Sequence, residues 1–290
     1  GMADLFIIGQ FNAVDGITAV SNGSQVMHML TAILVGLAMG VTVSISHEVG
    51  AKNHTLVERT IGNTITLFAC ISIISTLLLL IFVKPLVVLL NVPQEAMTGT
   101  VQYLVICFIG IPFITAYNII SSIYRGLGDS KSPMYIIAIA CLLNIVLDYL
   151  FIGLFHMGPV GAALGTTLSQ SVSVIIALIS MKYRTSDIHI KKEDLHLQPQ
   201  VFKQILKVGF PVAIQDGCIQ VGFIIITIIA NSRGLNDAAA VGIVEKMITA
   251  IFIIPSTMLA TVSALSAQNI GAKDYGRART VLKYAVIIAT

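Results

Sequence analysis

Residues 141–155 read Cys141-Leu-Leu-Asn144-Ile-Val-Leu-Asp148-Tyr-Leu-Phe-Ile-Gly-Leu-Phe155, an apolar run that contains one amide and one carboxylate. A carboxylate at membrane depth costs roughly 2.5–3.5 kcal/mol, so it persists mainly where it lines a polar cavity or has a partner. Residues four apart share one face of a helix, so Asn144 and Asp148 can offer their oxygens to one small cation or proton. This stretch therefore predicts a transmembrane helix that carries a functional site.

The composition of the whole chain agrees with this reading. Hydrophobic residues make up 56% of the sequence and charged residues only 11%, which is outside the range of soluble globular proteins. The apolar runs exceed the roughly 18–20 residues that cross a bilayer, and they are continuous, whereas barrel strands alternate. We therefore expect an all-α polytopic membrane protein, with spans at about 18–46, 61–90, 100–125, 132–155, 158–182, 203–231 and 237–268.

Both ends of the sequence lie inside further apolar stretches, at residues 2–9 and 281–290. We accordingly expect the sequence to be a piece of a longer protein. Most basic residues fall in alternate loops: Lys52 and Arg59, Arg125 and Lys131, Lys182 through Lys207, and Lys273 through Lys283. Only Lys84, Arg233 and Lys246 lie elsewhere. By the positive-inside rule these loops are cytoplasmic. We expect a multi-pass protein whose partner is the lipid bilayer and not nucleic acid, since the basic loops follow the membrane topology.

No motif in the sequence predicts an enzyme, a cofactor or a transition-metal site. The four cysteines lie one to a span with no Cys-x-x-Cys spacing, which argues against a metal cluster or a redox pair. A nucleophile with a matching base is also lacking in the sequence pattern.

The sequence contains an internal repeat. Val41-Thr42 followed by Gly50-Ala-Lys-Asn53 matches Val262-Ser263 followed by Gly271-Ala-Lys-Asp274 at a constant offset. Parallel repeats of this kind are typical of secondary transporters with two lobes. We predict two pseudo-symmetric six-helix lobes: a first transmembrane lobe at 1–184 with a partial first span, a cytoplasmic inter-lobe linker at 185–202, and the start of an incomplete second lobe at 203–290.

Asp4 is a second intramembrane acid, and Thr166 and Thr167 follow the small residues Gly161 and Gly165 one span after Asp148. Small residues let helices approach closely, which could bring a threonine hydroxyl toward Asp148. Asp4, Asn144, Asp148 and Thr166 together would supply only oxygen ligands, which suit sodium and not zinc or copper. The same set could hold a proton instead, because desolvation and a second carboxylate both favour the neutral form of an acid. The alternative is that Asp148 simply joins two helices.

Asn118, within Tyr117-Asn118-Ile-Ile-Ser121-Ser122, and Asp216, which follows Pro211, are candidates to line a substrate cavity. A structural role in helix packing is an equal alternative for both. Pro112, Pro211 and Pro255 fall inside or near the start of helical runs, where each removes a backbone hydrogen bond and permits a kink.

Taken in order, six motifs in the chain resemble the multidrug and toxic compound extrusion (MATE) transporters. They are Met2-Ala-Asp4-Leu-Phe-Ile-Ile-Gly9, Gly50-Ala-Lys-Asn53, Tyr124-Arg-Gly-Leu-Gly-Asp129-Ser-Lys-Ser-Pro133, Leu143-Asn144-Ile-Val-Leu-Asp148, Gly158-Pro-Val-Gly161-Ala-Ala-Leu-Gly-Thr166 and Gln268-Asn-Ile-Gly271-Ala. The resemblance implies twelve spans in two six-helix lobes and efflux of organic, often cationic, compounds in exchange for sodium or protons. With it we expect a monomer in a bacterial inner (plasma) membrane whose partners, besides the bilayer, are small organic molecules.

The same resemblance implies that Asp4 and Asp148, with Asn144 and Thr166, couple the ion, and that Asn118 faces the drug cavity. Asp216 lies near a position where the sodium-driven branch of the family can carry an acid. The alternative function with the same architecture is a lipid-linked precursor flippase, which would favour basic residues inside its cavity. The sequence places few basic residues there.

Overall fold

The computed structural model describes residues 2–11, 14–90, 92–184, 192–196, 198–233 and 235–289, and these residues form helices joined by short turns. In chain order the elements are α1 (Met2–Phe11), α2 (Val14–Gly50), α3 (His54–Leu89), α4 (Gln94–Ile109), α5 (Ile111–Gly126), α6 (Lys131–Asp148), the π-helix η1 (Tyr149–Leu154), α7 (Gly158–Arg184), the 3₁₀-helix η2 (Lys192–Leu195), α8 (Pro199–Arg233), α9 (Leu235–Gly271) and α10 (Tyr275–Ala289). The prediction of an all-α fold is confirmed.

Five of these helices are long and apolar enough to cross a membrane: Asp15–Gly50, His54–Leu89, Lys131–Leu154, Gly158–Tyr183 and Pro199–Ile226. α4 and α5 pass the same test together, as one span bent by 47°. Large apolar side chains are exposed along these helices, for example Ile73, Leu77 and Ile81 on α3. Such a surface fits a lipid environment, which confirms the predicted multi-pass membrane architecture.

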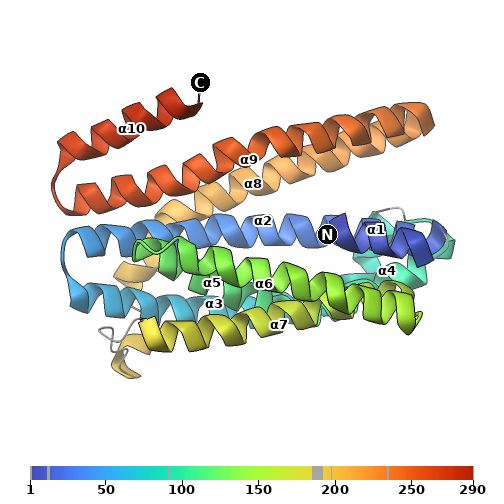
Figure 1. Cartoon of the computed structure of the whole chain (residues 1–290), viewed down its shortest axis with the longest axis horizontal. Helices are drawn as coiled ribbons and strands as arrows, with labels where there is room; N and C mark the ends of the chain where they lie inside the picture. Colours follow the sequence, from blue (N-terminus) through green and yellow to red (C-terminus); the bar gives the residue numbers. More distant parts are fainter. Residues whose placement is uncertain are drawn as a thin grey trace.

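α2 occupies the centre of the molecule. It packs against α4 and α5 on one side and against α8 and α9 on the other, as Figure 1 shows. α3 to α7 thus form the first lobe with α1 and α2, and α8 to α10 lie beyond α2. The α2–α3 turn, which holds Lys52, and the α9–α10 turn, which holds Lys273, lie at the same end of the bundle. This common end agrees with the cytoplasmic side that the basic loops predict.

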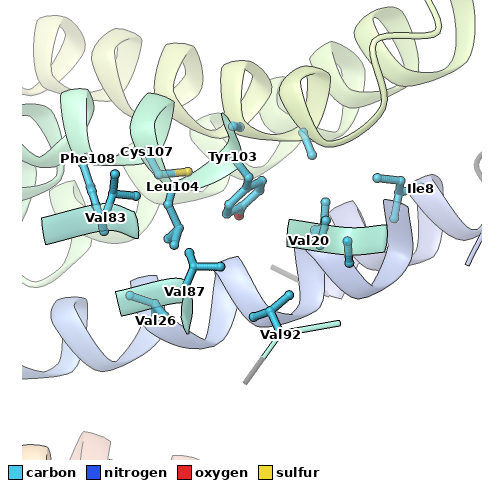
Figure 2. Close-up of a cluster of buried hydrophobic side chains, with 14 of the residues drawn as sticks. Ile8, Val20, Val26, Val83, Val87, Val92, Tyr103, Leu104, Cys107 and Phe108 are labelled. Carbon is cyan, nitrogen blue, oxygen red and sulfur yellow. The ribbon is translucent and has the colours of Figure 1, made fainter. Parts of the chain in front are cut away.

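A buried apolar cluster holds α1, α2, α3 and α4 together (Figure 2). Its fully buried members include Ile8 of α1, Val20 of α2, Val87 of α3 and Leu104 of α4. Tyr103 and Cys107 lie in the same cluster. The cluster fixes the short helix α1, which carries Asp4, against the rest of the first lobe.

The two copies of the sequence repeat form equivalent turns. Lys52 and Lys273 both adopt a left-handed conformation, with φ of 56° and 59°. The backbone amides of Asn53 and Asp274 donate to the backbone carbonyls of Glu48 and Asn269, at 3.0 and 2.9 Å. The side chains of Asn53 and Asp274 then accept hydrogen bonds from the first turn of the next helix. The repeat read from the sequence is therefore also a repeat in backbone geometry.

The equivalent turns contact each other reciprocally. A Cβ built on Gly50 would overlap the carbonyl of Gln268, and a Cβ on Gly271 would overlap the carbonyl of His47. Residue pairs that exchange roles in this way are what a two-fold relation between two surfaces produces. This contact joins α2 to α9 at the end of the bundle that holds the Lys52 and Lys273 turns.

Backbone irregularities fall at two places in the first lobe. The bend between α4 and α5 lies at Gly110, next to Pro112 at the start of α5. The run that follows Asp148 widens into the π-helix η1 before it ends. α8 and α9 continue through Pro211 and Pro255, so only the first of the three prolines lies beside a break between helices.

Part of the predicted linker is docked on the first lobe. η2 packs against α3. The side-chain amide of Asn63 donates to the backbone carbonyl of Asp194 at 3.2 Å, and the hydroxyl of Thr66 donates to the backbone carbonyl of Leu195 at 2.7 Å. Residues 185–191 and 197 of the predicted linker lie outside the described residues, and α8 begins at Pro199.

Candidate functional site

The candidate site is built from α1, α6 and α7, which contact one another inside the first lobe. Asp148 is the last residue of α6 before η1, and its side chain is fully buried. Asp4 on α1 is 1% exposed. Phe11 of α1 packs edge-to-face on Tyr149 of η1, with ring centroids 6.3 Å apart, and so holds the two elements together beside the site. Two acids are therefore enclosed in an otherwise apolar part of the protein.

The four residues of the predicted coupling site are linked in one chain of contacts. Asn144 donates its amide to Oδ1 of Asp148 at 3.4 Å. The carboxyl groups of Asp148 and Asp4 lie close enough to interact electrostatically. Thr166 donates its hydroxyl to Oδ2 of Asp4 at 3.1 Å. The structure thus brings Asp4, Asn144, Asp148 and Thr166 together, and the threonine hydroxyl binds Asp4 and not Asp148.

Close packing of α6 on α7 makes this arrangement possible. Gly165 lies directly over Asp148, and a Cβ built there would overlap Oδ1 of that residue. Gly161, one turn earlier, approaches the backbone of Phe151 so closely that a Cβ would lie 3.1 Å from the carbonyl carbon. The predicted role of these two glycines, to let α6 and α7 approach, agrees with the geometry.

The electrostatics of the site require a positive charge or a proton. Two ionised carboxylates in contact repel strongly when they are buried, so the pair is stable only if they share a proton or a cation. Within the described part of the chain, no hydrogen-bond donor reaches Oδ2 of Asp148. The oxygens of Asp4, Asp148, Asn144 and Thr166 are suitable for sodium by their chemistry, and the carboxyl pair is suitable for a proton.

Sequence reasoning missed Tyr103 of α4. Its side chain is 2% exposed and lies within electrostatic reach of both Asp4 and Asp148. Cys107, one turn later on the same helix, contacts the Tyr103 hydroxyl. A tyrosine in the middle of an apolar span is the signal that could have identified this position, because a buried hydroxyl needs a partner.

Among the described residues, no hydrogen bond that the structure shows joins either candidate residue of the substrate cavity to this cluster. Asn118 of α5 donates its amide to the carbonyl of Ile114 on its own helix, at 2.8 Å. Asp216 lies on α8, where it is half-buried. Thr167, the neighbour of Thr166, donates to Ile106 of α4 at 3.5 Å. In the described ranges, no group of three or more His, Cys, Asp or Glu side chains is placed to hold a metal ion.

Replacing Gly165 with alanine should separate α6 from α7 at the site. The new methyl group overlaps Oδ1 of Asp148, and overpacking of this kind costs about 1–3 kcal/mol. We expect a lower thermal unfolding midpoint and weaker ion-coupled transport for Gly165→Ala in the full-length protein.

The matched control for this variant is Gly222→Ala. Gly222 lies within α8 and has no atom within 4 Å of a built Cβ, so the change should be neutral or slightly stabilising, by up to about 1 kcal/mol. Equal unfolding midpoints for Gly165→Ala and the wild type would contradict the close α6–α7 contact.

Comparison with known proteins identifies the family. The MatE family model matches residues 1–150 and 211–290. The probable multidrug resistance protein YpnP of Bacillus subtilis is 30% identical over 92% of this chain and 60% of its own length. YoeA of the same organism, also a probable multidrug resistance protein, is 24% identical over 98% of this chain and 63% of its own. A FAD transporter of Shewanella oneidensis is 23% identical over 97% and 63%. The chain thus spans about 60% of the length of these relatives.

Solved structures share the fold. A MOP superfamily transporter from Pyrococcus furiosus superimposes with a TM-score of 0.89 at 22% identity, over 99% of this chain and 64% of that one. An outward-facing multidrug resistance MATE family transporter superimposes with a TM-score of 0.88 at 22% identity, with the same coverage. Since the family model matches most of the sequence and the architecture agrees, this chain belongs to the multidrug and toxic compound extrusion (MATE) family.

Proposed function

We propose that the full-length protein is a secondary active antiporter that exports small organic, often cationic, compounds in exchange for sodium ions or protons. The observation that carries this proposal is the buried contact between the carboxyl groups of Asp4 and Asp148. An acid pair in a membrane span is a functional site by default, because its placement in the bilayer is costly. The protein is then a transporter and not an enzyme, and it needs a sodium ion or a proton as its coupling ion.

The geometry supports a simple coupling mechanism. A sodium ion or a proton between Asp4 and Asp148 removes their repulsion, so that α1 stays packed against α6 and α7. Loss of the ion restores the repulsion and favours movement of α1 away from the pair. Binding of the ion therefore biases the equilibrium between two conformations of the first lobe, which is what an exchange mechanism requires.

The two lobes meet along α2, which packs against α8 and α9. We propose that organic compounds bind between the lobes and that the lobes rock about this contact to expose them alternately to each side. Asn118 of α5 and Asp216 of α8 are the residues that we propose for the cavity. The negative charge of Asp216 would attract an organic cation.

The relatives guide the choice of substrate class. Several are named as multidrug resistance proteins and one as a FAD transporter, so the substrate is stated here as a small organic compound. A lipid-linked precursor flippase is not favoured, because these relatives are named for multidrug resistance and FAD transport. We propose that the protein acts as a monomer in a bacterial inner membrane, the side of its basic loops being cytoplasmic.

The experiment that tests this proposal uses the full-length protein in sealed lipid vesicles. Export of a fluorescent organic cation is measured under a sodium gradient, under a proton gradient and with no gradient. We expect one of the two ion gradients to drive accumulation of the compound against its own concentration gradient. Equal transport in all three conditions would indicate a channel or a uniporter, and the antiport proposal would then be wrong.

A further inference from the structure

A cavity of about 420 Å³ lies between α2, α8 and α9, away from the acid pair. Its walls come from both lobes, since α2 belongs to the first and α8 and α9 to the second. Six polar side chains line it: Ser44, His47, Gln204, Lys207, Ser263 and Ser266. No carboxylate is among the residues that line the cavity, so the charge on its walls is positive.

The cavity is held open by close backbone contacts on both sides of it. Toward the membrane interior, a Cβ on Gly36 of α2 would lie 2.7 Å from the backbone of Ala213, and Gly40 would overlap Ile205. At the other end of the cavity, Gly50 packs on the backbone carbonyl of Gln268 and Gly271 packs on that of His47. Because the helices already touch above and below, they cannot come closer at the cavity without losing these contacts.

Ser44 gives the cavity an unsatisfied hydrogen-bonding group. Its side chain is 2% exposed, and within the described ranges its hydroxyl has no hydrogen-bond partner. A buried hydroxyl without a partner costs about 1–3 kcal/mol, so such a group is expected where a ligand or water completes it. Ser44 lines the cavity together with Lys207 of α8, so an oxygen-rich anion in this space would meet a hydroxyl from one lobe and an ammonium from the other.

The remaining walls are apolar and suit an amphiphile. Val43, Val208, Ala267 and Ile270 contribute hydrocarbon surface beside the polar groups. The cavity lies close to the Gly50 and Gly271 turns, at the end of the bundle for which the basic loops predict the cytoplasmic side. Basic pockets between transmembrane helices on this side bind anionic headgroups.

We propose that this cavity binds a phosphate group, presented by an anionic phospholipid of the inner leaflet or by free phosphate, with Lys207 and Ser44 as its ligands. The ring of His47 is already paired with the carboxylate of Glu48 at 3.3 Å, so His47 is not assigned as a ligand. Since the ligand bridges α2 to α8, its binding stabilises the arrangement in which the cytoplasmic ends of the two lobes are joined.

The test is the thermal unfolding midpoint of the detergent-solubilised full-length protein during titration with three probes. These are short-chain phosphatidylglycerol, short-chain phosphatidylcholine and inorganic phosphate. A ligand that binds only the folded protein raises the midpoint with a concentration dependence that reports its affinity. We expect phosphatidylglycerol to raise the midpoint at much lower concentration than phosphatidylcholine.

The variants assign the effect to the cavity. Lys207→Gln should need about tenfold more phosphatidylglycerol for half of the effect, because a charged hydrogen-bond donor is lost. Ser44→Ala should weaken the effect several-fold. Lys203→Gln is the matched control, because Lys203 is exposed one turn earlier on α8 and does not line the cavity; it should behave as the wild type.

Each outcome decides the proposal. If only inorganic phosphate raises the midpoint, and Lys207→Gln weakens this effect, the natural ligand is free phosphate and not a lipid. Equal responses to the two lipids, no response to any probe, or equal losses in Lys203→Gln and Lys207→Gln would overturn the proposal.

Discussion

The Asp148→Asn variant of the full-length protein should lose ion-coupled export while it remains folded. Asparagine keeps the size of the side chain, but it cannot ionise and cannot neutralise a bound cation. A charged group that contributes about 3 kcal/mol to binding of the ion corresponds to about a 100-fold loss of affinity. We therefore expect the rate of gradient-driven export in vesicles to fall to near background.

Asp4→Asn should produce a loss of similar size, because Asp4 forms the other half of the pair. The matched control is Asp15→Asn, since Asp15 lies at the start of α2 and is exposed. Comparable thermal unfolding midpoints for the three variants would show that the loss does not come from misfolding. Normal export by Asp148→Asn under either gradient would exclude the acid pair as the coupling site, and attention would turn to Asp216.

Valine at Gly50 or at Gly271 should prevent the two lobes from closing at the cytoplasmic end. Either side chain would overlap a backbone carbonyl of the opposite turn, at Gln268 or at His47. A backbone carbonyl cannot move away as a flexible side chain can, so the turns must separate. Since the two contacts are reciprocal, we expect the two variants to have the same effect.

The separation can be measured with a cysteine at position 266, which lines the cavity between the lobes. We expect a membrane-impermeant thiol reagent on the cytoplasmic side to label Ser266→Cys about tenfold faster in the Gly50→Val and Gly271→Val backgrounds, as a shift of about 1.4 kcal/mol in the closed state produces. Gly222→Val is the control, because Gly222 has open space around it. Unchanged labelling in both backgrounds would show that this contact does not control access.

The sequence predicted the helices well, and it marked Asp148 and Asn144 as neighbours, because both depend on local patterns. A carboxylate in an apolar run marks Asp148 without any knowledge of the fold, and the spacing of four places Asn144 beside it. The small residues at Gly161 and Gly165 predicted the close approach of α7, which the structure places against α6. The sequence suggested a threonine hydroxyl near Asp148, and in the structure Thr166 donates to Asp4, since small rotations of a helix decide which carboxylate a hydroxyl reaches.

Other features could not be read from the sequence because they arise from packing between distant segments. The π-helix after Asp148 and the electrostatic contact of Tyr103 with both acids depend on how α1, α4 and α6 meet. The repeat around Gly50 and Gly271 was visible, but its reciprocal contact was not, because identical motifs do not reveal that they touch. Pro211 and Pro255 lie inside α8 and α9, which continue through them.

The most direct test of the account is a count of the cations held by the acid pair. Binding of radioactive sodium, and the release of protons when an organic substrate is added, can both be measured on the purified full-length protein and on its Asp148→Asn variant. We predict that the wild type binds sodium, or releases protons, in an amount stoichiometric with the protein. Asp148→Asn should do neither. A variant that retains the wild-type sodium binding or proton release would contradict the assignment of the coupling ion to Asp4 and Asp148.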